Sequence, residues 1–516
     1  MKKQLQKIVL VSILVLLSLS NNINAQTPGW AWATDTINGL GGMITDASEN
    51  VYIAHNLGAN TTFLSKHNTN GHTIWTKNAT GKSTSPHGVD YPNSIAFDPS
   101  GNIFVSGYFT SDSITLETTV IHRVSALDMF LAKYTNTGSL IWVKNVGVGD
   151  IANTGFNVTC DVDGNAIVVG SFSTPTLAIG TTTLTNNCVA SGVSCPTMLV
   201  AKFDGSNGNS IWANAKFSPN INGTSYAYSA VTDASKNIYI AGDFAGLSGD
   251  VKYNSAGDTL WTQPNGGRYI TKDAAGNIYT ATEFADVYKI DPNNGNILWS
   301  KSATGTVSDF KAVSINTDAS GKVYFAGQFN SNITFGTTTL ANAGQSDIFI
   351  VSYDNTGNLL WAKGLGGVGN DALNSTTTDA SGNVYVGGFI ISSAATTTLG
   401  FDAIDTIQTS VAYGGGIFFN VYFAKLGNNT TGVKQSLGNS NQLVIYPNPA
   451  TNVLNINAPL GKTTIRIYDV FGNLVNQTIV NGNQLSIDVS QLATGFYTLV
   501  TEGNNTNYIQ KIIVQH

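Results

Sequence analysis

Histidines are the side chains of this sequence best suited to bind a transition metal, and most of them lie in one stretch. Four of the six are His55, His67, His72 and His87. A zinc or copper site would need two or three of these imidazoles to converge with a carboxylate. No two of them have the i, i+4 spacing of a helical metal site, and the surrounding residues predict separate strands and loops. We therefore expect no metal ion, with a site in this stretch as the alternative.

The segment Asp161-Val-Asp-Gly-Asn165 is a second candidate, because its oxygen-bearing side chains are spaced as in a calcium-binding loop. An EF-hand loop ends with a glutamate that binds calcium through both oxygens, and that glutamate is absent here. Related segments elsewhere in the chain indicate that this one is a hairpin turn. Calcium at Asp161 is the weaker interpretation.

Carboxylate pairs are the usual machinery of glycoside cleavage, and Asp150 and Asp371 occupy matching loop positions in the repeats described below. Matching positions in repeats usually serve packing. Neither a nucleophile-elbow motif nor a phosphate-binding loop occurs in the sequence. We therefore predict no catalytic residue and no cofactor, so that the chain is not an enzyme. The alternative is a carboxylate pair at the mouth of a central channel.

Strands must position these residues, because the composition disfavours helices. Only 11% of the residues are charged, while glycine (54 residues), threonine and asparagine are abundant, which favours strands joined by polar turns. The net charge is −6 and no basic patch stands out. Nucleic acid and anionic membranes are therefore poor candidates for partners.

A phrase of the general form Asp-x-x-Gly-Asn, followed by a β-rich run, recurs along the chain. The aspartate can accept backbone N–H groups at the start of a turn, and the glycine supplies the positive φ that closes a hairpin. Between copies lie a third strand, a glycine turn and an aliphatic–Trp pair, which together predict four strands in up-and-down order. The seven copies begin at Asp46, Asp98, Asp161, Asp233, Asp273, Asp318 and Asp379.

The tryptophans indicate how the repeat array ends. The six aliphatic–Trp pairs end at Trp75, Trp142, Trp212, Trp261, Trp299 and Trp361. The seventh unit lacks one, whereas Trp30 and Trp32 precede the first aspartate phrase. If that amino-terminal segment is the fourth strand of the last unit, the chain closes into a wheel and hides its strand edges. We therefore predict an all-β fold with a seven-bladed β-propeller over residues 26–432, in which Trp32 lies near Phe423.

Differences between the units are where function is expected on a repeat scaffold. The loops between the second and third strands are short in units four and five. They are long and rich in threonine in units two, three, six and seven, where alternating Thr and aliphatic residues predict an extra hairpin. These hairpins either widen the rim or form a hydroxyl-rich face that binds a polysaccharide or a protein.

Two segments carry a family resemblance. Gly366-Gly-Val-Gly-Asn-Asp371 and Asp379-Ala-Ser-Gly-Asn-Val-Tyr-Val-Gly-Gly388 resemble the bacterial SBBP-type β-propeller repeat. The Gly-x-x-Leu-Trp phrases also resemble quinoprotein-type propeller repeats, but the adjacent cysteines typical of some quinoproteins are missing. The resemblance covers about 400 residues. It implies a fold and leaves the function open, because propellers include binders, enzymes and scaffolds.

The repeat pattern ends at a predicted linker, residues 433–441, which is rich in Gly, Asn and Ser. Residues 442–516 contain short alternating strands, which predict a small Ig-like β-sandwich. The motifs are Tyr446-Pro-Asn-Pro449, Ile467-Tyr-Asp469, Gly495-Phe-Tyr497 and Lys511-Ile-Ile-Val514. Their order resembles the type A C-terminal sorting domain of the Bacteroidetes type IX secretion system. The resemblance implies that residues 442–516 engage the secretion machinery, with release or surface attachment afterwards; a generic carbohydrate-binding or fibronectin-like sandwich is the alternative.

Residues 1–25 have the pattern of a secretory signal peptide. Three lysines precede an apolar run of about 12 residues, too short for a membrane span, and cleavage is predicted between Ala25 and Gln26. Export would permit disulfides, and Cys188 and Cys195 are the favoured pair because they flank a six-residue loop. Cys160 would then be a free, buried thiol. A metal site built on the three cysteines is disfavoured, because no nearby histidine completes it.

These inferences combine into one functional hypothesis. We expect a secreted or cell-surface β-propeller that binds or adheres to a glycan or a protein, is exported by the type IX secretion system, and has no transmembrane segment in its mature form. The alternative is a secreted polysaccharide lyase or hydrolase with its site at the channel mouth.

Overall fold

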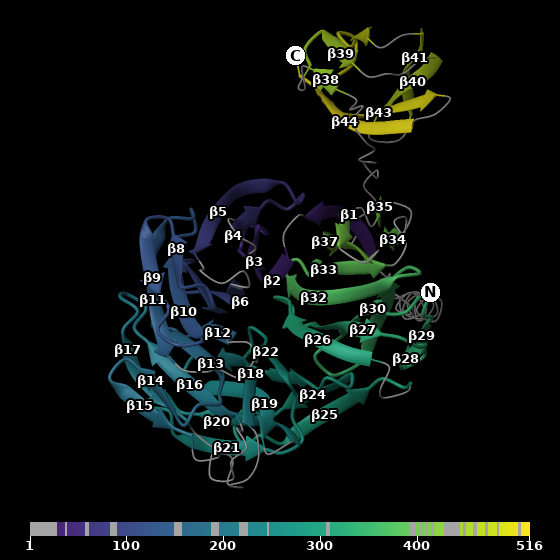
Figure 1. Ribbon diagram of the computed structural model, residues 1–516. Helices are drawn as coiled ribbons and strands as arrows, with labels where there is room; N and C mark the ends of the chain where they lie inside the picture. Colours follow the sequence, from purple (N-terminus) through teal and green to yellow (C-terminus); the bar gives the residue numbers. More distant parts are fainter. Residues whose placement is uncertain are drawn as a thin grey trace, which may run out of the picture. The chain divides into compact units, whose positions relative to one another are not determined.

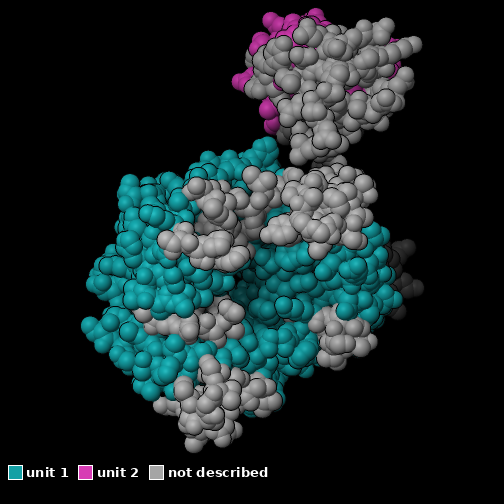
Figure 2. All heavy atoms as spheres, viewed as in Figure 1, with its two compact units in different colours: residues 1–428 teal, residues 429–516 magenta. Residues whose placement is uncertain are grey.

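The computed structural model describes most of the chain outside its amino terminus and several loops. The two compact units span residues 1–428 and 429–516 and are considered separately (Figure 2). Within the described residues, no helix is long and apolar enough to cross a membrane. The structure describes residues 28–36, 39–56, 61–82, 90–148, 157–186, 196–215, 225–244, 247–305, 310–392, 398–401, 405–408, 411–413, 417–427, 444–446, 450–457, 462–469, 473–481, 484–503 and 507–515.

The described strands of the first unit include seven antiparallel sheets, each built on four strands that we call a blade; additional strands extend three of these sheets (Figure 1). Blade 1 contains β2 (Gly39–Thr45), β3 (Val51–Asn56), β4 (Thr61–His67) and β5 (Thr73–Lys82), and blade 2 contains β6 (Asp90–Phe97), β7 (Ile103–Phe109), β10 (Asp128–Tyr134) and β11 (Leu140–Val148). Blade 3 contains β12 (Asn157–Cys160), β13 (Ala166–Phe172), β16 (Thr197–Phe203) and β17 (Ser210–Asn214), and blade 4 contains β18 (Ser225–Thr232), β19 (Ile238–Phe244), β20 (Leu247–Tyr253) and β21 (Thr259–Gln263). Blade 5 contains β22 (Tyr269–Lys272), β23 (Ile278–Ala281), β24 (Asp286–Ile290) and β25 (Ile297–Ser302), and blade 6 contains β26 (Phe310–Thr317), β27 (Val323–Phe329), β30 (Asp347–Tyr353) and β31 (Leu359–Leu365). Blade 7 contains β32 (Asn370–Thr378), β33 (Val384–Ser392), β37 (Ile417–Gly427) and β1 (Gly29–Thr36).

The blades close into a ring. The first strand of each blade contacts the first strand of the next, and β32 of blade 7 contacts β2 of blade 1 (Figure 1). The amino-terminal strand β1 pairs with β37, with Ala33 opposite Ala424. The ring centroids of Trp32 and Phe423 are 4.8 Å apart. The all-β prediction and the predicted exchange of the terminal strand are confirmed.

The aspartate phrases form the turns between the first and second strands, at one face of the ring that we call the turn face. The fourth residue of every copy has a positive φ. In two copies the residue there is Glu49 or Lys236 (φ 62° and 64°), so the glycine of the predicted phrase is a preference and not a requirement. The connections from second to third strand and from blade to blade lie at the opposite face, which we call the loop face.

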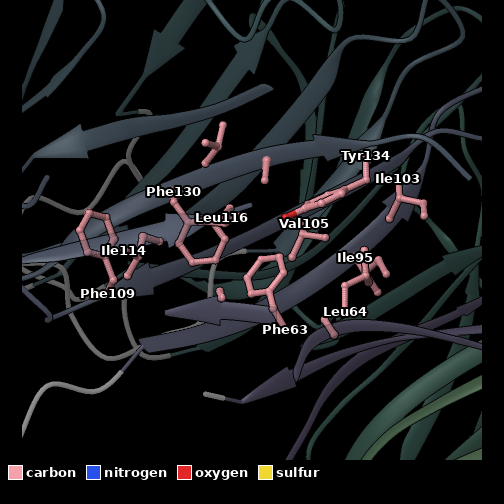
Figure 3. Close-up of a cluster of buried hydrophobic side chains, with 14 of the residues drawn as sticks. Phe63, Leu64, Ile95, Ile103, Val105, Phe109, Ile114, Leu116, Phe130 and Tyr134 are labelled. Carbon is pink, nitrogen blue, oxygen red and sulfur yellow. The ribbon is translucent and has the colours of Figure 1, made fainter. Parts of the chain in front are cut away.

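Apolar side chains of neighbouring blades form the core. Phe63 of blade 1 packs against Phe130 and Tyr134 of blade 2, with ring centroids 5.7 and 6.1 Å apart (Figure 3). Ile114 and Leu116, from an inserted hairpin, are fully buried in the same cluster. Stability therefore depends on contacts between blades as well as on pairing within them.

The predicted hairpins are present between the second and third strands of blades 2, 3, 6 and 7. They consist of β8 (Ser113–Leu116) with β9 (Thr119–His122), β14 (Thr176–Ile179) with β15 (Thr182–Thr185), β28 (Ile333–Phe335) with β29 (Thr338–Leu340), and β34 (Thr398–Phe401) with β35 (Asp405–Gln408). β8 pairs with β5 and β14 with β11, which are the outer strands of the preceding blades. Thr334 of β28 likewise pairs with Thr304, just after β25. Three of the four hairpins therefore cover the outer edge of the preceding blade. A further short strand, β36 (Val411–Tyr413), pairs with β37.

The second unit is a sandwich of two sheets around one core. One sheet contains β38 (Val444–Tyr446), β39 (Val453–Asn457) and β42 (Gln484–Asp488), and the other contains β41 (Leu474–Asn481), β40 (Lys462–Tyr468), β43 (Gly495–Gly503) and β44 (Asn507–Val514). Leu454 from the first sheet and Ile467 and Leu499 from the second are fully buried together. The Ig-like assignment and the linker at 433–441, which lies outside the described residues, stay predictions.

Candidate functional site

Every aspartate of the turn phrase accepts the backbone N–H of the residue four positions later. Asp161 Oδ1 accepts the N–H groups of Asp163 and Asn165 at 3.0 and 2.9 Å, and Oδ2 lies 2.7 Å from Lys202 Nζ. Burial opposes the charge of Asp161, but the bonds from Lys202 and Asn165 hold its pKa below the ordinary value. The hairpin interpretation of this segment is thus supported. In the described parts of the chain, no three His, Cys, Asp or Glu side chains gather where they could hold a metal ion.

Five tryptophans of the repeat donate a hydrogen bond to the next blade. Trp32 Nε1 donates to the carbonyl oxygen of Thr69 at 2.9 Å, which joins blade 7 to blade 1. The positive-φ Gly71 lies against the Trp32 ring, where a Cβ atom would come within 2.9 Å of it. The same donor–acceptor relation joins Trp142 to Gly205, Trp212 to Ser255, Trp261 to Pro292 and Trp299 to Asn355, at 3.2–3.3 Å. Each acceptor lies in the turn between the third and fourth strands of the next blade, so this turn receives the tryptophan of the preceding blade.

Two histidines of blade 1, His55 and His67, belong to a buried hydrogen-bonded group. Ser65 Oγ lies 2.6 Å from His55 Nε2 and 2.8 Å from His67 Nε2, and all three side chains are buried. Burial lowers the pKa of His67, which favours a neutral imidazole. His72 is exposed, and His87 lies outside the described residues.

Of the residues in the cysteine and signal-peptide predictions, the structure describes only Cys160. Cys160 is a free thiol whose pKa burial raises to about 12, which makes it unreactive. Cys188, Cys195, Ala25 and Gln26 lie outside the described residues, so the disulfide and the cleavage site stay predictions.

The structure describes only one member of the suggested carboxylate pair. Asp150 lies outside the described residues. Asp371 is completely buried, and its Oδ2 accepts the N–H of Gly367 at 2.7 Å. It therefore does not face solvent, as a catalytic carboxylate in an open channel would.

A polar cluster that sequence reasoning missed lies on the loop face, between blades 4 and 5. We call it the Arg268 cluster, and it consists of Tyr228, Asp243, Arg268 and Glu283. Arg268 Nη2 donates to Asp243 Oδ2 at 2.6 Å, Nη1 donates to Glu283, and the guanidinium lies 4.9 Å from the centre of the Tyr228 ring. The Tyr228 hydroxyl also donates to Asp243 Oδ2, at 3.1 Å. One guanidinium thus organises two carboxylates and a phenol.

The Arg268 cluster is partly open to solvent and has aromatic neighbours. The side chains of Arg268 and Glu283 are 26% and 23% exposed, and Phe284, next in sequence, is 45% exposed. The Tyr226 ring stacks on Tyr228 with centroids 5.9 Å apart. Burial and the charge of Asp243 raise the pKa of Tyr228, so its phenol is a hydrogen-bond donor and not a base. The arrangement suits ligand binding better than proton transfer.

The sequence indicates only some features of the Arg268 cluster. The short loops of units four and five were visible, and Arg268 is one of only three arginines in the chain, with Arg123 and Arg466. Nothing in the spacing of Tyr228, Asp243 and Glu283 indicates that they meet. Their proximity depends on how one blade is placed beside the next.

A polar cleft of about 340 Å³ lies on the turn face between blades 2 and 3. It is lined by Asp98, Lys133, Asp163, Asn165 and Asp204, among others. These carboxylates already bond to lysines or turn N–H groups, for example Asp163 to Lys236 Nζ at 2.6 Å. The cleft is therefore a weaker candidate than the Arg268 cluster.

Comparison with known proteins identifies a family for part of each unit. Residues 444–515 match the secretion system C-terminal sorting domain, and residues 78–113 match the beta-propeller repeat. The chain thus carries an SBBP β-propeller repeat and a type IX sorting domain. The sorting domain implies export, with secretion or attachment to the cell surface.

The curated relatives are distant or short. WD repeat-containing protein L264 of Acanthamoeba polyphaga mimivirus is 25% identical over 356 residues, which cover 58% of this chain and 24% of that protein. An endo-acting ulvan lyase of Formosa agariphila is 34% identical over 74 residues, or 14% of each chain. The chain therefore spans about a quarter or less of either relative.

Several solved structures are also similar. BamB from Moraxella catarrhalis has a TM-score of 0.37 at 12% identity, covering 77% of this chain and 99% of that one. The RRP9 WD40 repeats have a TM-score of 0.43 at 8% identity, covering 78% and 99%.

Proposed function

We propose that this chain is an exported β-propeller that binds a glycan at the Arg268 cluster, without catalysis. The observation that supports this most is the combination of exposed Phe284 with a partly exposed network of Arg268, Asp243 and Glu283. Carbohydrate ligands present apolar ring faces and many hydroxyl groups, which match an aromatic surface beside charged hydrogen-bonding groups.

Charge narrows the class of glycan. Asp243 and Glu283 together carry one more negative charge than Arg268 balances, and both carboxylates bond to the guanidinium. A sulfated or uronic acid polymer would be repelled by this surplus. The Arg268 cluster therefore fits a neutral polysaccharide whose hydroxyl groups donate to the carboxylates.

The location is consistent with a binding role. Blades 4 and 5 have short second-to-third strand connections, and no described inserted hairpin pairs with β17 or β21, the outer strands of blades 3 and 4. The Arg268 cluster thus lies between two blades that carry no inserted hairpin among the described residues. A long polymer could reach it from the side.

Binding should depend on Phe284 and Arg268. We expect Phe284→Ala and Arg268→Gln each to weaken binding of a neutral polysaccharide, first identified on a glycan array, by about tenfold or more, which is ~1.4 kcal/mol. Titration calorimetry with the mature chain measures this. Val124→Ala is the control, because Val124 is an apolar side chain in another second-to-third strand connection on the same face and is more exposed than Phe284 (73% against 45%).

Two results would contradict the proposal. One is unchanged affinity in both variants. The other is depolymerisation of the bound glycan by the wild-type chain, which would show an enzyme instead of a binder.

A further inference from the structure

Two buried aspartates meet at the loop face where blade 6 joins blade 7. Asp347 is the first residue of β30, and Asp371 is the second residue of β32. Their exposed fractions are 2% and 0%. The backbone brings them together, because the N–H of Asp371 donates to the carbonyl oxygen of Ser346, the residue before Asp347, at 2.8 Å.

Each carboxylate has one satisfied oxygen and one unsatisfied oxygen. Asp347 Oδ2 accepts the N–H of Ala343 at 2.6 Å, and Asp371 Oδ2 accepts the N–H of Gly367 at 2.7 Å. The Oδ1 atoms of both residues are buried, and neither has a hydrogen-bond partner within the described residues. Unpaired buried carboxylate oxygens are costly, so they point to a ligand.

Blade 2 shows how the same position is satisfied elsewhere. Asp128 is the first residue of β10, as Asp347 is of β30, and it accepts the N–H of Val124 at 2.6 Å, as Asp347 does from Ala343. Asp128 also accepts bonds from Ser125 Oγ and Asn145 Nδ2, both at 2.6 Å. Its carboxylate is therefore fully bonded by the protein.

Both side-chain donors of blade 2 are replaced by glycine in blade 6. Ser125 precedes Asp128 by three residues, and Gly344 precedes Asp347 by three. Asn145 pairs with Phe130 across the strands, and Gly364 pairs with Phe349 at the same place. Blade 6 thus keeps the backbone donor and loses the hydroxyl and the amide.

The loop between the two blades packs closely against the pair, and its Gly369 carbonyl oxygen already accepts the N–H of Gln345 at 3.0 Å. A Cβ atom at Gly344 would lie 2.1 Å from the carbonyl oxygen of Gly367 and 2.8 Å from that of Gly369, so these carbonyls crowd the position that Ser125 occupies in blade 2. A Cβ atom at Gly366 would lie 2.1 Å from Asp347 Oδ1, so this loop passes directly over the carboxylate. Carboxylates with backbone carbonyls are the hard oxygen ligands that Ca²⁺ prefers.

The electrostatic environment of the Asp347 and Asp371 carboxylates favours a bound cation. Burial, and then the charge of Asp347, raise the pKa of Asp371 to about 7, and burial raises the pKa of Asp347. No lysine or arginine forms an ion pair with either carboxylate among the described residues, and the nearby titratable group is the buried Tyr422. Two ionised carboxylates at this junction repel each other, and a bound cation removes that repulsion.

We propose that Asp347 and Asp371 bind a Ca²⁺ ion at the junction of blades 6 and 7. The ion replaces the donors that Ser125 and Asn145 provide to Asp128. It is a structural ion, since both aspartates are buried, and it ties the last two blades of the ring together. This inference is independent of the glycan-binding proposal.

Thermal unfolding of the mature chain at pH 8 tests the proposal, followed by tryptophan fluorescence in EGTA and in excess CaCl₂. All eight tryptophans lie between residues 30 and 361, so the signal reports the first unit alone. At about one hundred times Kd, Ca²⁺ should raise Tm by about 3 °C or more. The increase should disappear in Asp347→Asn and Asp371→Asn, and should persist in Asp163→Asn, an exposed aspartate of a turn phrase.

The same variants show whether the fold is intact. In EGTA at pH 8, Asp371→Asn should melt at or above the wild-type Tm, because the substitution removes a buried like charge. Equal wild-type Tm values in EGTA and CaCl₂ would overturn the proposal and indicate that the pair shares a proton instead. A Ca²⁺ effect that survives in both asparagine variants would also overturn it.

Discussion

Deleting residues 28–36 should abolish the cooperative unfolding of the first unit. The deleted segment pairs along its length with β37, and Trp30, Trp32 and Ala33 are buried in it. Without β1, the edge of β37 is exposed, and the contact from Trp32 to Thr69 that joins blade 7 to blade 1 is lost. We expect a chain that aggregates or unfolds without a sharp transition.

Six tryptophans remain in this deletion variant, so fluorescence still reports its unfolding. A synthetic peptide of residues 28–36, added in excess, should restore a cooperative transition, whereas a peptide of scrambled sequence should not. A deletion variant with the wild-type Tm and no tendency to bind the peptide would show that β1 does not close the ring.

Replacing Lys133 by methionine should destabilise the first unit by about 3–5 kcal/mol, because it leaves a buried carboxylate without its counter-ion. Lys133 Nζ lies 2.8 Å from Asp98 Oδ2, and both side chains are less than a tenth exposed. The same ammonium donates to the carbonyl oxygen of Gly205 in blade 3, at 2.8 Å. One substitution therefore breaks a turn contact and an inter-blade contact together.

The matched control is Lys236→Met. Lys236 forms an ion pair with Asp163 at 2.6 Å, but the two side chains are 36% and 49% exposed. An exposed pair contributes little, so we expect no measurable loss. Urea unfolding followed by tryptophan fluorescence measures both variants. Equal losses in the two would contradict the assignment of Lys133 as a buried anchor of the repeat.

The architecture of the first unit could be predicted because the same turn and strand signals occur in every repeat. Each aspartate phrase supplies its own turn, and the unequal count of tryptophans and aspartates shows which strand is exchanged. The predicted contact of Trp32 with Phe423 required no information beyond this pairing. The fold was predictable because the same turn residues and tryptophans recur at matching positions of each repeat.

The placement of the inserted hairpins did not follow from the sequence. Their alternating Thr and aliphatic residues predicted the hairpins themselves. However, β8 and β14 pair with the outer strands of the preceding blades, and that choice depends on the distance between sheets.

The candidate sites escaped prediction for a related reason. Arg268 and Asp243 come from different blades, so their contact depends on how the blades pack. The missing donors around Asp347 become visible only when its neighbours are compared with those of Asp128. Such sites are defined by what departs from the repeat, whereas the sequence pattern shows what is shared. A comparison of the residues opposite each buried aspartate, such as Asn145 and Gly364, would have been the useful signal.

The closed ring is tested most directly by a disulfide between the two strands that complete blade 7. Ala33 and Ala424 are directly opposite each other in β1 and β37 and are both buried. In the Ala33→Cys/Ala424→Cys variant, mild oxidation of the native monomer should link these positions within one chain, as mass spectrometry of the proteolytic peptides would show. The Ala33→Cys/Ala241→Cys variant, whose second cysteine lies in blade 4, should form no such link. Linkage only between chains, or equal linkage in both variants, would contradict the closed ring.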